Sequence, residues 1–321
     1  MTERSPLNVL LVGATGTAGR ATATALHAAG HDVICLVRPG RGADLAGIRR
    51  VEGDATDRRC LDAVMREGRI DAVISTLASR SGTPAEAWAI DHAAHCALLA
   101  AALENGVGRF VLLSAICVQR PRLAFQHAKL AFEAELSRAP ISWSILRATA
   151  LFKSLSGQVG RVRGGKPFLV FGDGRLTACK PISDADLGRT LVRALSDPGM
   201  ARRILPVGGP GPAITPLDQA GMLCRALGQP TRVRHVPVAL IDGIAGTLGV
   251  FGRLAPRLAA KADLARIGRY YATESMLVLD PATGRYDAAA TPEYGSDTLA
   301  AHYRDLAAGR VRADLGAHAV F

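Results

Sequence analysis

The chain has 321 residues, of which 49% are hydrophobic and 21% charged, and its formal net charge is +11. These values fit a folded, enzyme-sized protein and exclude a disordered, collagen-like or disulfide-framework chain. The basic charge favours anionic partners. However, the arginines are dispersed and no zinc-finger or RNA-binding signature occurs, so we expect no nucleic acid partner.

The cysteines and the apolar stretches of the chain indicate where in the cell the protein is expected. The six cysteines form no Cys-x-x-Cys pair and no signal peptide is evident, which predicts reduced thiols and a cytoplasmic location. We expect no metal, because His92 and Cys96 lack further ligands at useful spacing.

The apolar stretch 236–251 is too short to span a membrane. We expect a helix packed on the core there, with peripheral membrane contact as the alternative.

Strand-like and helix-like segments alternate through the first half of the chain. We predict strands at 7–12, 32–37, 72–76, 109–113 and 142–146, and helices at 20–29, 61–66, 87–105 and 127–137. This alternation predicts an α/β fold with a Rossmann-type doubly wound parallel sheet. The regularity ends near residue 150. We therefore predict a dinucleotide-binding domain over 1–150 and a smaller, irregular substrate lobe over 151–321, partly packed back on the sheet. The lobe should contain a strand at 166–171 and a helix capped by Ser183.

A glycine-rich segment, 13–19, joins the first predicted strand to the first predicted helix. Glycine is needed there because the backbone must turn sharply and approach a pyrophosphate closely. The free N–H groups of the helix start then meet the negative charge. The expected cofactor contacts are Gly13, Thr15, Gly16, Thr17, Ala18 and Gly19.

The end of the second strand discriminates between the two nicotinamide cofactors. An acidic residue there would bind the ribose hydroxyls of NAD, but this chain has Arg38. A guanidinium forms charge-assisted bonds with a 2′-phosphate, so we predict NADPH, with Arg41 as a weaker second candidate. Asp54 and Leu77, which follow the third and fourth strands, are expected beside the cofactor.

The segment Phe125-Gln126-His127-Ala128-Lys129 matches the Tyr-x-x-x-Lys signature of short-chain dehydrogenases with the tyrosine hydroxyl deleted. Ser114 and Lys129 should both point toward the nicotinamide ribose. Lys129 is the catalytic candidate, because it can bind the ribose hydroxyls and relay a proton. For Ser114, a hydroxyl satisfied by the backbone is an equal alternative. Without the tyrosine, reduction of a simple ketone is disfavoured.

Two adjacent tyrosines, Tyr270 and Tyr271, lie beside Arg266 and Arg269. Such a cluster of aromatic rings and guanidinium groups suits a large planar anion. Packing of the tyrosines against the sheet domain is the alternative.

Dispersed segments give the chain a family resemblance. The chain resembles the atypical short-chain reductases of the NmrA and isoflavone-reductase type, and among them the NADPH-dependent vinyl reductases of chlorophyll biosynthesis. The matching segments are 87–91, 110–119, 152–155, 171–174, 178–183, 208–211, 268–272 and 274–277. The resemblance implies reduction of the 8-vinyl group of divinyl chlorophyllide a or divinyl protochlorophyllide a to ethyl. It also implies a Mg-containing tetrapyrrole as partner, at or near photosynthetic membranes.

This resemblance accounts for the missing tyrosine. A conjugated vinyl group that accepts hydride leaves its charge in the macrocycle, so no oxygen needs a proton. The expected substrate contacts are Phe125, Phe152, Lys153, Tyr270 and Tyr271. The proton could come from water, Lys129, Lys153 or the tyrosine pair. A basic lobe should attract the pigment propionate through Lys153, Arg161, Arg163, Lys166 and Lys180.

Two other function classes are compatible with parts of the sequence. A non-catalytic NADP-binding sensor or scaffold of the NmrA-like type would keep the glycine loop and tolerate Phe125. A nucleotide-sugar epimerase or dehydratase would need a group that deprotonates a hydroxyl, and Phe125 argues against it.

Overall fold

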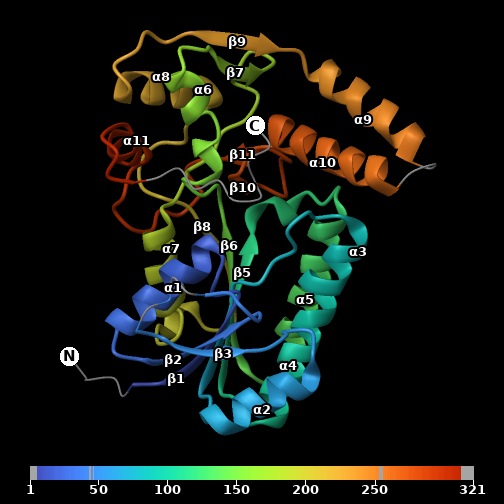
Figure 1. The fold of residues 1–321 in the computed structure, drawn as a ribbon, viewed down its shortest axis with the longest axis vertical. Helices are drawn as coiled ribbons and strands as arrows, with labels where there is room; N and C mark the ends of the chain where they lie inside the picture. Colours follow the sequence, from blue (N-terminus) through green and yellow to red (C-terminus); the bar gives the residue numbers. More distant parts are fainter. Residues whose placement is uncertain (1–5, 43–44, 46, 253–255, 312–321) are drawn as a thin grey trace.

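A seven-stranded parallel sheet forms the centre of the computed structural model, which describes residues 6–42, 45, 47–252 and 256–311 (Figure 1). The strand order is β3-β2-β1-β4-β5-β6-β8, and every neighbouring pair is parallel. The strands are β1 (Asn8–Val12), β2 (Asp32–Val37), β3 (Arg49–Glu52), β4 (Ala72–Ser75), β5 (Arg109–Ala115), β6 (Ser142–Ala148) and β8 (Arg203–Val207). The predicted doubly wound sheet is confirmed. Its order reverses between β1 and β4, and ligands bind beyond the carboxyl ends of strands at such a point.

Helices cover both faces of this sheet (Figure 1). One face carries α1 (Thr17–Ala28) and α7 (Asp184–Arg193), whose leucines and alanines pack on the strands. The other face carries α2 (Arg58–Gly68), α4 (His95–Glu104) and α5 (Ala124–Arg138). The helix α7 approaches α1 very closely at Gly188, where a Cβ atom would lie 2.7 Å from the Ala21 carbonyl carbon. Any side chain at 188 would push the two helices apart.

The helix predicted over 87–105 is in fact built from three pieces. The short helix α3 (Pro84–Ala87) leads into a π-helical segment, Trp88–Ala94, and α4 follows. A π-helical turn is wider than an α-helical one and is frequent at functional sites. Here it sets the direction of Asp91, as described below.

The second half of the chain both completes the sheet and forms a lobe above it. The helix α7 and the strand β8 belong to the sheet, and Ser183 caps α7 by accepting the Asp186 N–H at 2.9 Å, as predicted. The lobe core is built around α6 (Val159–Arg163), α8 (Pro216–Ala226) and α11 (Leu299–Ala307). In the lobe, β7 (Phe168–Phe171) pairs with β9 (Val233–Val236), which confirms the predicted strand at 166–171. The domain boundary at 150 stays a prediction.

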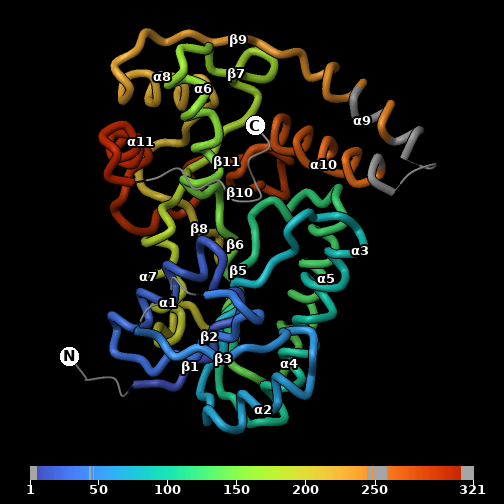
Figure 2. The backbone as a smooth tube through the Cα atoms, in the orientation of Figure 1, coloured from blue at the N-terminus to red at the C-terminus, as the bar shows by residue number. Residues whose placement is uncertain are grey.

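A helical hairpin projects from the lobe to one side. It consists of α9 (Val238–Gly252) and α10 (Pro256–Thr273), which lie side by side in Figures 1 and 2. The stretch 236–251 was expected to pack on the core. Its helix instead has α10 as its main neighbour. Within the described ranges, no helix combines the length and apolarity needed to cross a membrane.

Two short strands connect the lobe to the sheet domain. They are β10 (Val278–Leu279) and β11 (Tyr286–Asp287), which pair antiparallel. The Gln119 side chain, just beyond β5, donates to the Leu277 carbonyl and accepts from the Leu279 N–H. The buried Glu274 carboxylate binds Arg120 and Arg122. These bonds fix the lobe over the carboxyl end of β5.

Candidate active site

The glycine loop between β1 and α1 has the geometry of a dinucleotide cradle. Gly13 has a φ of +87°, and a Cβ there would lie 2.6 Å from the Leu77 nitrogen. A Cβ at Gly19 would lie 2.1 Å from the Gly13 carbonyl oxygen. Side chains are therefore excluded at both positions, and the loop touches the segment that follows β4. Ala18 is buried, and Leu77 is half-buried next to Gly13.

The start of α1 is open to an anion. Its N-cap is Gly16, which has no side chain to satisfy the first N–H groups, and its first turn contains no acidic residue. The positive end of the helix dipole is thus left for a ligand. These features fit the pyrophosphate of a nicotinamide dinucleotide, held by the loop and by Thr17.

Two cations lie at this helix start. Lys153 Nζ donates to Thr17 Oγ1 at 2.9 Å, and Arg20 donates to the Thr15 carbonyl at 2.7 Å. Asp184, at the start of α7, faces both of them. Its burial raises the pKa of that carboxyl, while Lys153 and Arg20 act in the opposite direction. Lys153 therefore lies against the cofactor loop, and its expected contact with the substrate stays a prediction.

Arg38 is exposed immediately after β2, where the adenosine ribose binds in this type of sheet. Asp54 lies close to it and is held in a tight turn. Its Oδ1 accepts both the backbone N–H and the hydroxyl of Thr56 at 2.8 Å. These hydrogen bonds, together with the charge of Arg38, lower the pKa of Asp54.

Lys129 lies on α5 and forms an ion pair with Asp91. Its Nζ is 2.9 Å from Asp91 Oδ1; the lysine side chain is 12% exposed and the aspartate is fully buried. The same oxygen accepts the Ser79 N–H at 3.3 Å, so the pair is tied to the loop after β4. Asp91 Oδ2 is buried without a hydrogen-bond partner among the described residues.

His95 supports the π-helical segment that carries Asp91. Its Nδ1 donates to the Ile90 carbonyl at 2.9 Å, so its Nε2 accepts the Ser75 hydroxyl at 2.9 Å. Burial, with a contribution from the nearby Lys129 ammonium, lowers the pKa of His95 to about 4. The ring is therefore neutral at physiological pH. Sequence reasoning missed both Asp91 and His95, although Asp91 ends one of the segments that carry the family resemblance.

Ser114 was expected to contact the cofactor. In the structure its hydroxyl donates to Glu133 Oε1 at 2.5 Å, inside the protein. Glu133, on α5, is also paired with Arg147 of β6. This arrangement ties α5 to the two strands beneath it. The cofactor role of Ser114 stays a prediction.

Phe125, one helical turn before Lys129, belongs to an apolar cluster between the sheet domain and α10. It packs with Tyr270 and with Ile267, and it lies beneath Gly82. The Tyr270 hydroxyl donates to the carbonyl oxygens of Cys117 and Arg120 at 2.8 and 3.0 Å. Burial raises the pKa of Tyr270 to about 12. This hydroxyl is thus engaged in structure.

The remaining predicted substrate residues divide between surface and core. Tyr271 is 44% exposed and packs edge to face against Tyr270. Phe152 is buried in the lobe core, where its ring contacts His302, so a direct substrate contact would require its displacement. The expected basic lobe is also largely engaged within the protein. Arg161 and Arg163 bind backbone carbonyls, and Lys180 binds Glu293.

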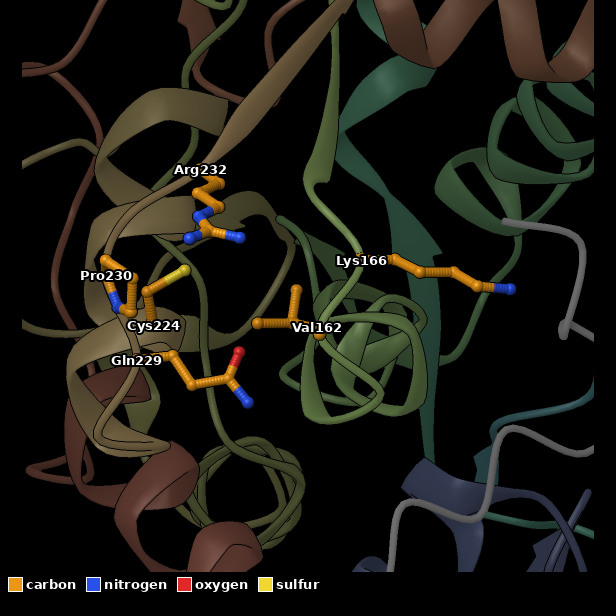
Figure 3. Close-up of a pocket in the computed structure, with 7 residues that line it drawn as sticks. Val162, Lys166, Cys224, Gln229, Pro230 and Arg232 are labelled. Carbon is orange, nitrogen blue, oxygen red and sulfur yellow. The ribbon is translucent and has the colours of Figure 1, made fainter.

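A small pocket lies in the lobe, away from the glycine loop. It is bounded by α6, α8 and the segment before β9 (Figure 3). Cys224, Gln229 and Arg232 face the hollow, whereas the Lys166 side chain points away from it (Figure 3). None of the pocket's lining residues belongs to the cofactor loop or to the Asp91–Lys129 pair. Over the described part of the chain, no group of three or more His, Cys, Asp or Glu side chains is arranged to hold a metal ion.

Comparison with known proteins agrees with this geometry. Residues 13–198 match the family described as NAD(P)H-binding. The chloroplastic divinyl chlorophyllide a 8-vinyl-reductase of Oryza sativa subsp. indica is 45% identical, over 99% of this chain and 83% of the relative. The protein of that name from Arabidopsis thaliana is 41% identical, over 92% of this chain and 76% of the relative. The chain belongs to the divinyl chlorophyllide a 8-vinyl-reductase family.

The fold of this chain is similar to that of solved structures. The crystal structure of an epimerase from Methanothermobacter thermautotrophicus superposes with a TM-score of 0.70, covering 95% of this chain and 94% of that one. At 18% identity this likeness concerns the fold alone. The NAD(P)H-binding match spans Gly13, Arg38, Asp91, Lys129 and Lys153. This protein therefore belongs among proteins that bind a nicotinamide cofactor, NADH or NADPH.

Proposed function

We propose that this protein is an NADPH-dependent reductase of the 8-vinyl group of divinyl chlorophyllide a or divinyl protochlorophyllide a, in chlorophyll or bacteriochlorophyll biosynthesis. The observation that carries the proposal is identity of 41–45% to reductases of that name over nearly the whole chain. The glycine loop and the Asp91–Lys129 pair supply the cofactor cradle and a charged group beside it.

The preference for NADPH over NADH rests on Arg38. This exposed guanidinium follows β2, and no acidic residue stands in its place to bind the ribose hydroxyls. Arginine binds a phosphate through two parallel charge-assisted bonds. The 2′-phosphate of NADPH is therefore its expected ligand.

The chemistry requires one hydride and one proton. NADPH held by the glycine loop would supply the hydride, and the terminal carbon of the vinyl group would accept it. The electron pair of the vinyl double bond moves into the conjugated macrocycle, and the carbon next to the ring then takes a proton. Because no alkoxide forms, the position of the usual tyrosine can be filled by Phe125.

Lys129 is the proton donor that the geometry supports best among the alternatives left open by the sequence. Tyr270 donates its hydroxyl to backbone carbonyls, and Lys153 is bound to Thr17. Lys129 is instead held by the carboxylate of Asp91, with its Nζ 2.9 Å from Asp91 Oδ1. An ammonium at this place can give a proton and can also bind the ribose hydroxyls.

The pigment itself is a flat anion. The exposed ring of Tyr271 offers a stacking surface for it, and the net charge of +11 favours the approach of its propionate. Peripheral contact with photosynthetic membranes stays a prediction.

The deciding experiment mixes the purified protein with NADPH and divinyl chlorophyllide a and records the Soret band. We expect a blue shift as the vinyl group becomes ethyl, and little shift with Lys129→Met, since a general acid contributes about 10²–10⁴-fold to a rate. Binding of NADPH without any spectral change would instead favour the non-catalytic sensor or scaffold.

A further inference from the structure

We infer that Lys153 is a cofactor-binding residue whose ammonium group binds the pyrophosphate of the nicotinamide dinucleotide. The inference deepens the proposed function and rests on its cofactor, but not on the identity of the pigment. It changes the role of a lysine that the sequence placed with the substrate.

The first support is the position of the ammonium group. Lys153 Nζ is 2.9 Å from Oγ1 of Thr17, the first residue of α1. A lysine ammonium can only donate, so Thr17 accepts and keeps its own proton for donation. A phosphate placed over the helix start would thus meet the α1 N–H groups, the Thr17 hydroxyl and the Lys153 ammonium together.

The second support is the backbone that carries Lys153. The preceding residue, Phe152, is 3% exposed in the lobe core, and its N–H donates to the Ile182 carbonyl. The Lys153 carbonyl accepts the Ser156 N–H. The chain reaches this point directly after β6, at the carboxyl edge of the sheet, where dinucleotides bind. The lysine is therefore delivered to the cofactor loop by a well-packed segment.

The third support is the local charge balance. Asp184 faces Lys153 and Arg20, yet burial raises the pKa of that carboxyl. Its Oδ1 is buried and accepts no hydrogen bond within the described residues. Lys153 and Arg20 thus bring two positive charges to the start of α1. Charge-assisted hydrogen bonds from these cations to the two negative charges of a pyrophosphate would be strong.

Lys153 and Arg38 make a matched pair for the test. The pyrophosphate is common to NADPH and NADH, whereas the 2′-phosphate belongs to NADPH alone. Dissociation constants for both cofactors would be measured by the fluorescence of the bound nicotinamide, without pigment. The variants are Lys153→Met, Lys153→Arg and Arg38→Ala, with Lys166→Met as the control because Lys166 is an exposed lysine of the same lobe, outside the glycine loop.

We expect Lys153→Met to weaken NADPH and NADH by the same factor, about tenfold, as for loss of a hydrogen bond to a charged group. Arg38→Ala should weaken NADPH much more than NADH, and Lys166→Met should change neither. Lys153→Arg keeps the charge and should stay within about threefold of the unaltered protein.

Three results would overturn the inference. These are unchanged binding by Lys153→Met, a loss confined to NADPH, and a loss with Lys153→Arg as large as with Lys153→Met. A near-ultraviolet circular dichroism spectrum of each variant checks that the fold is intact. Normal cofactor binding without pigment reduction would reject the proposed function and leave this inference standing.

Discussion

The Asp91–Lys129 ion pair joins two segments that are 38 positions apart in the sequence. A fully buried carboxylate is tolerated only when it is paired and hydrogen-bonded, and Asp91 has both the ammonium and the Ser79 N–H. Removing one partner of such a pair leaves the other charge uncompensated. We therefore expect Asp91 to act as a positioning residue that orients the Lys129 ammonium group.

Replacement of Asp91 by Asn tests this role. We expect kcat for pigment reduction to fall by at least about tenfold, because Lys129 loses the carboxylate that orients it. The dissociation constant of NADPH should change by less than about threefold, since the glycine loop and Arg38 are untouched. Stopped-flow turnover and cofactor titration measure the two quantities. His92→Asn, on the same π-helical segment, is the control, and an undiminished kcat in Asp91→Asn would contradict the role.

Individual residues were predicted from sequence where the local pattern carries the function. The positions of Gly13 and Gly19 follow from the strand–loop–helix order, and that of Arg38 follows from the end of the second strand; their cofactor roles stay predictions. The ion-pair partner of Lys129, Asp91, could not be predicted from the sequence. A π-helical turn does not follow from residue propensities, and the buried Asp91 lies within one.

The contact between α1 and α7 brings Asp184 to the cofactor end of the sheet. Gly188 allows this close approach, and the approach buries the Asp184 carboxyl beside Lys153 and Arg20. Because the pKa of Asp184 is raised above its usual 3.8, the folded state binds its proton more tightly than the unfolded state does. Its contribution to stability is therefore lost as the pH rises through the interval between 3.8 and the raised value.

Replacement of Asp184 by Asn should consequently stabilise the protein at neutral pH. If removal of the buried charge contributes about 1 kcal/mol, the melting temperature at pH 7 should rise by roughly 2–4 °C. The gain should shrink as the pH is lowered through the raised pKa of Asp184, and it should vanish well below pH 3.8, where the carboxyl is protonated in both states. Differential scanning fluorimetry across this range measures the effect. A decrease in melting temperature at pH 7, with the unaltered protein as reference, would show that the ion pairs outweigh burial.

At the level of elements, the sequence predicted most of the first half of the fold, but in the second half it predicted only the strand at 166–171 and the helix capped by Ser183. Buried parallel strands are continuous apolar runs, so β1, β2, β4, β5 and β6 could each be found. The strand β8 was missed because it is not a continuous buried run: it begins with the exposed residues Arg203 and Ile204 and contains Pro206. The role of Glu274 depends on Arg120 and Arg122, about 150 positions earlier. Such long-range partners leave no periodic signal.

The whole molecule has a core that both halves of the chain build together. One face of the sheet packs Val9, Leu11 and Leu26 from the first half against Leu187 and Leu191 of α7. The strand β8 pairs with β6 along five residues. The sheet domain is therefore complete only when the chain has passed residue 207.

A fragment of residues 1–150 tests how far the first half depends on the second. We expect it to unfold without a cooperative transition and to bind a hydrophobic dye, because the α7 face and the β6 edge are uncovered. Calorimetry and dye fluorescence, compared with the full chain, measure this. A sharp transition together with normal NADPH binding would instead show that the first half folds alone and would support a boundary at 150.

The late return of β8 to the sheet has a consequence for synthesis on the ribosome. Six strands emerge by Ala148, but the partner of β6 ends only at Val207, about 60 residues later. At translation rates of roughly 5–20 residues per second, the β6 edge waits about 3–12 s without its neighbour. During that interval the nascent chain presents an unpaired strand and an uncovered apolar face, which are the features that invite association between chains. Protection by chaperones would therefore matter most while residues 149–207 are being made.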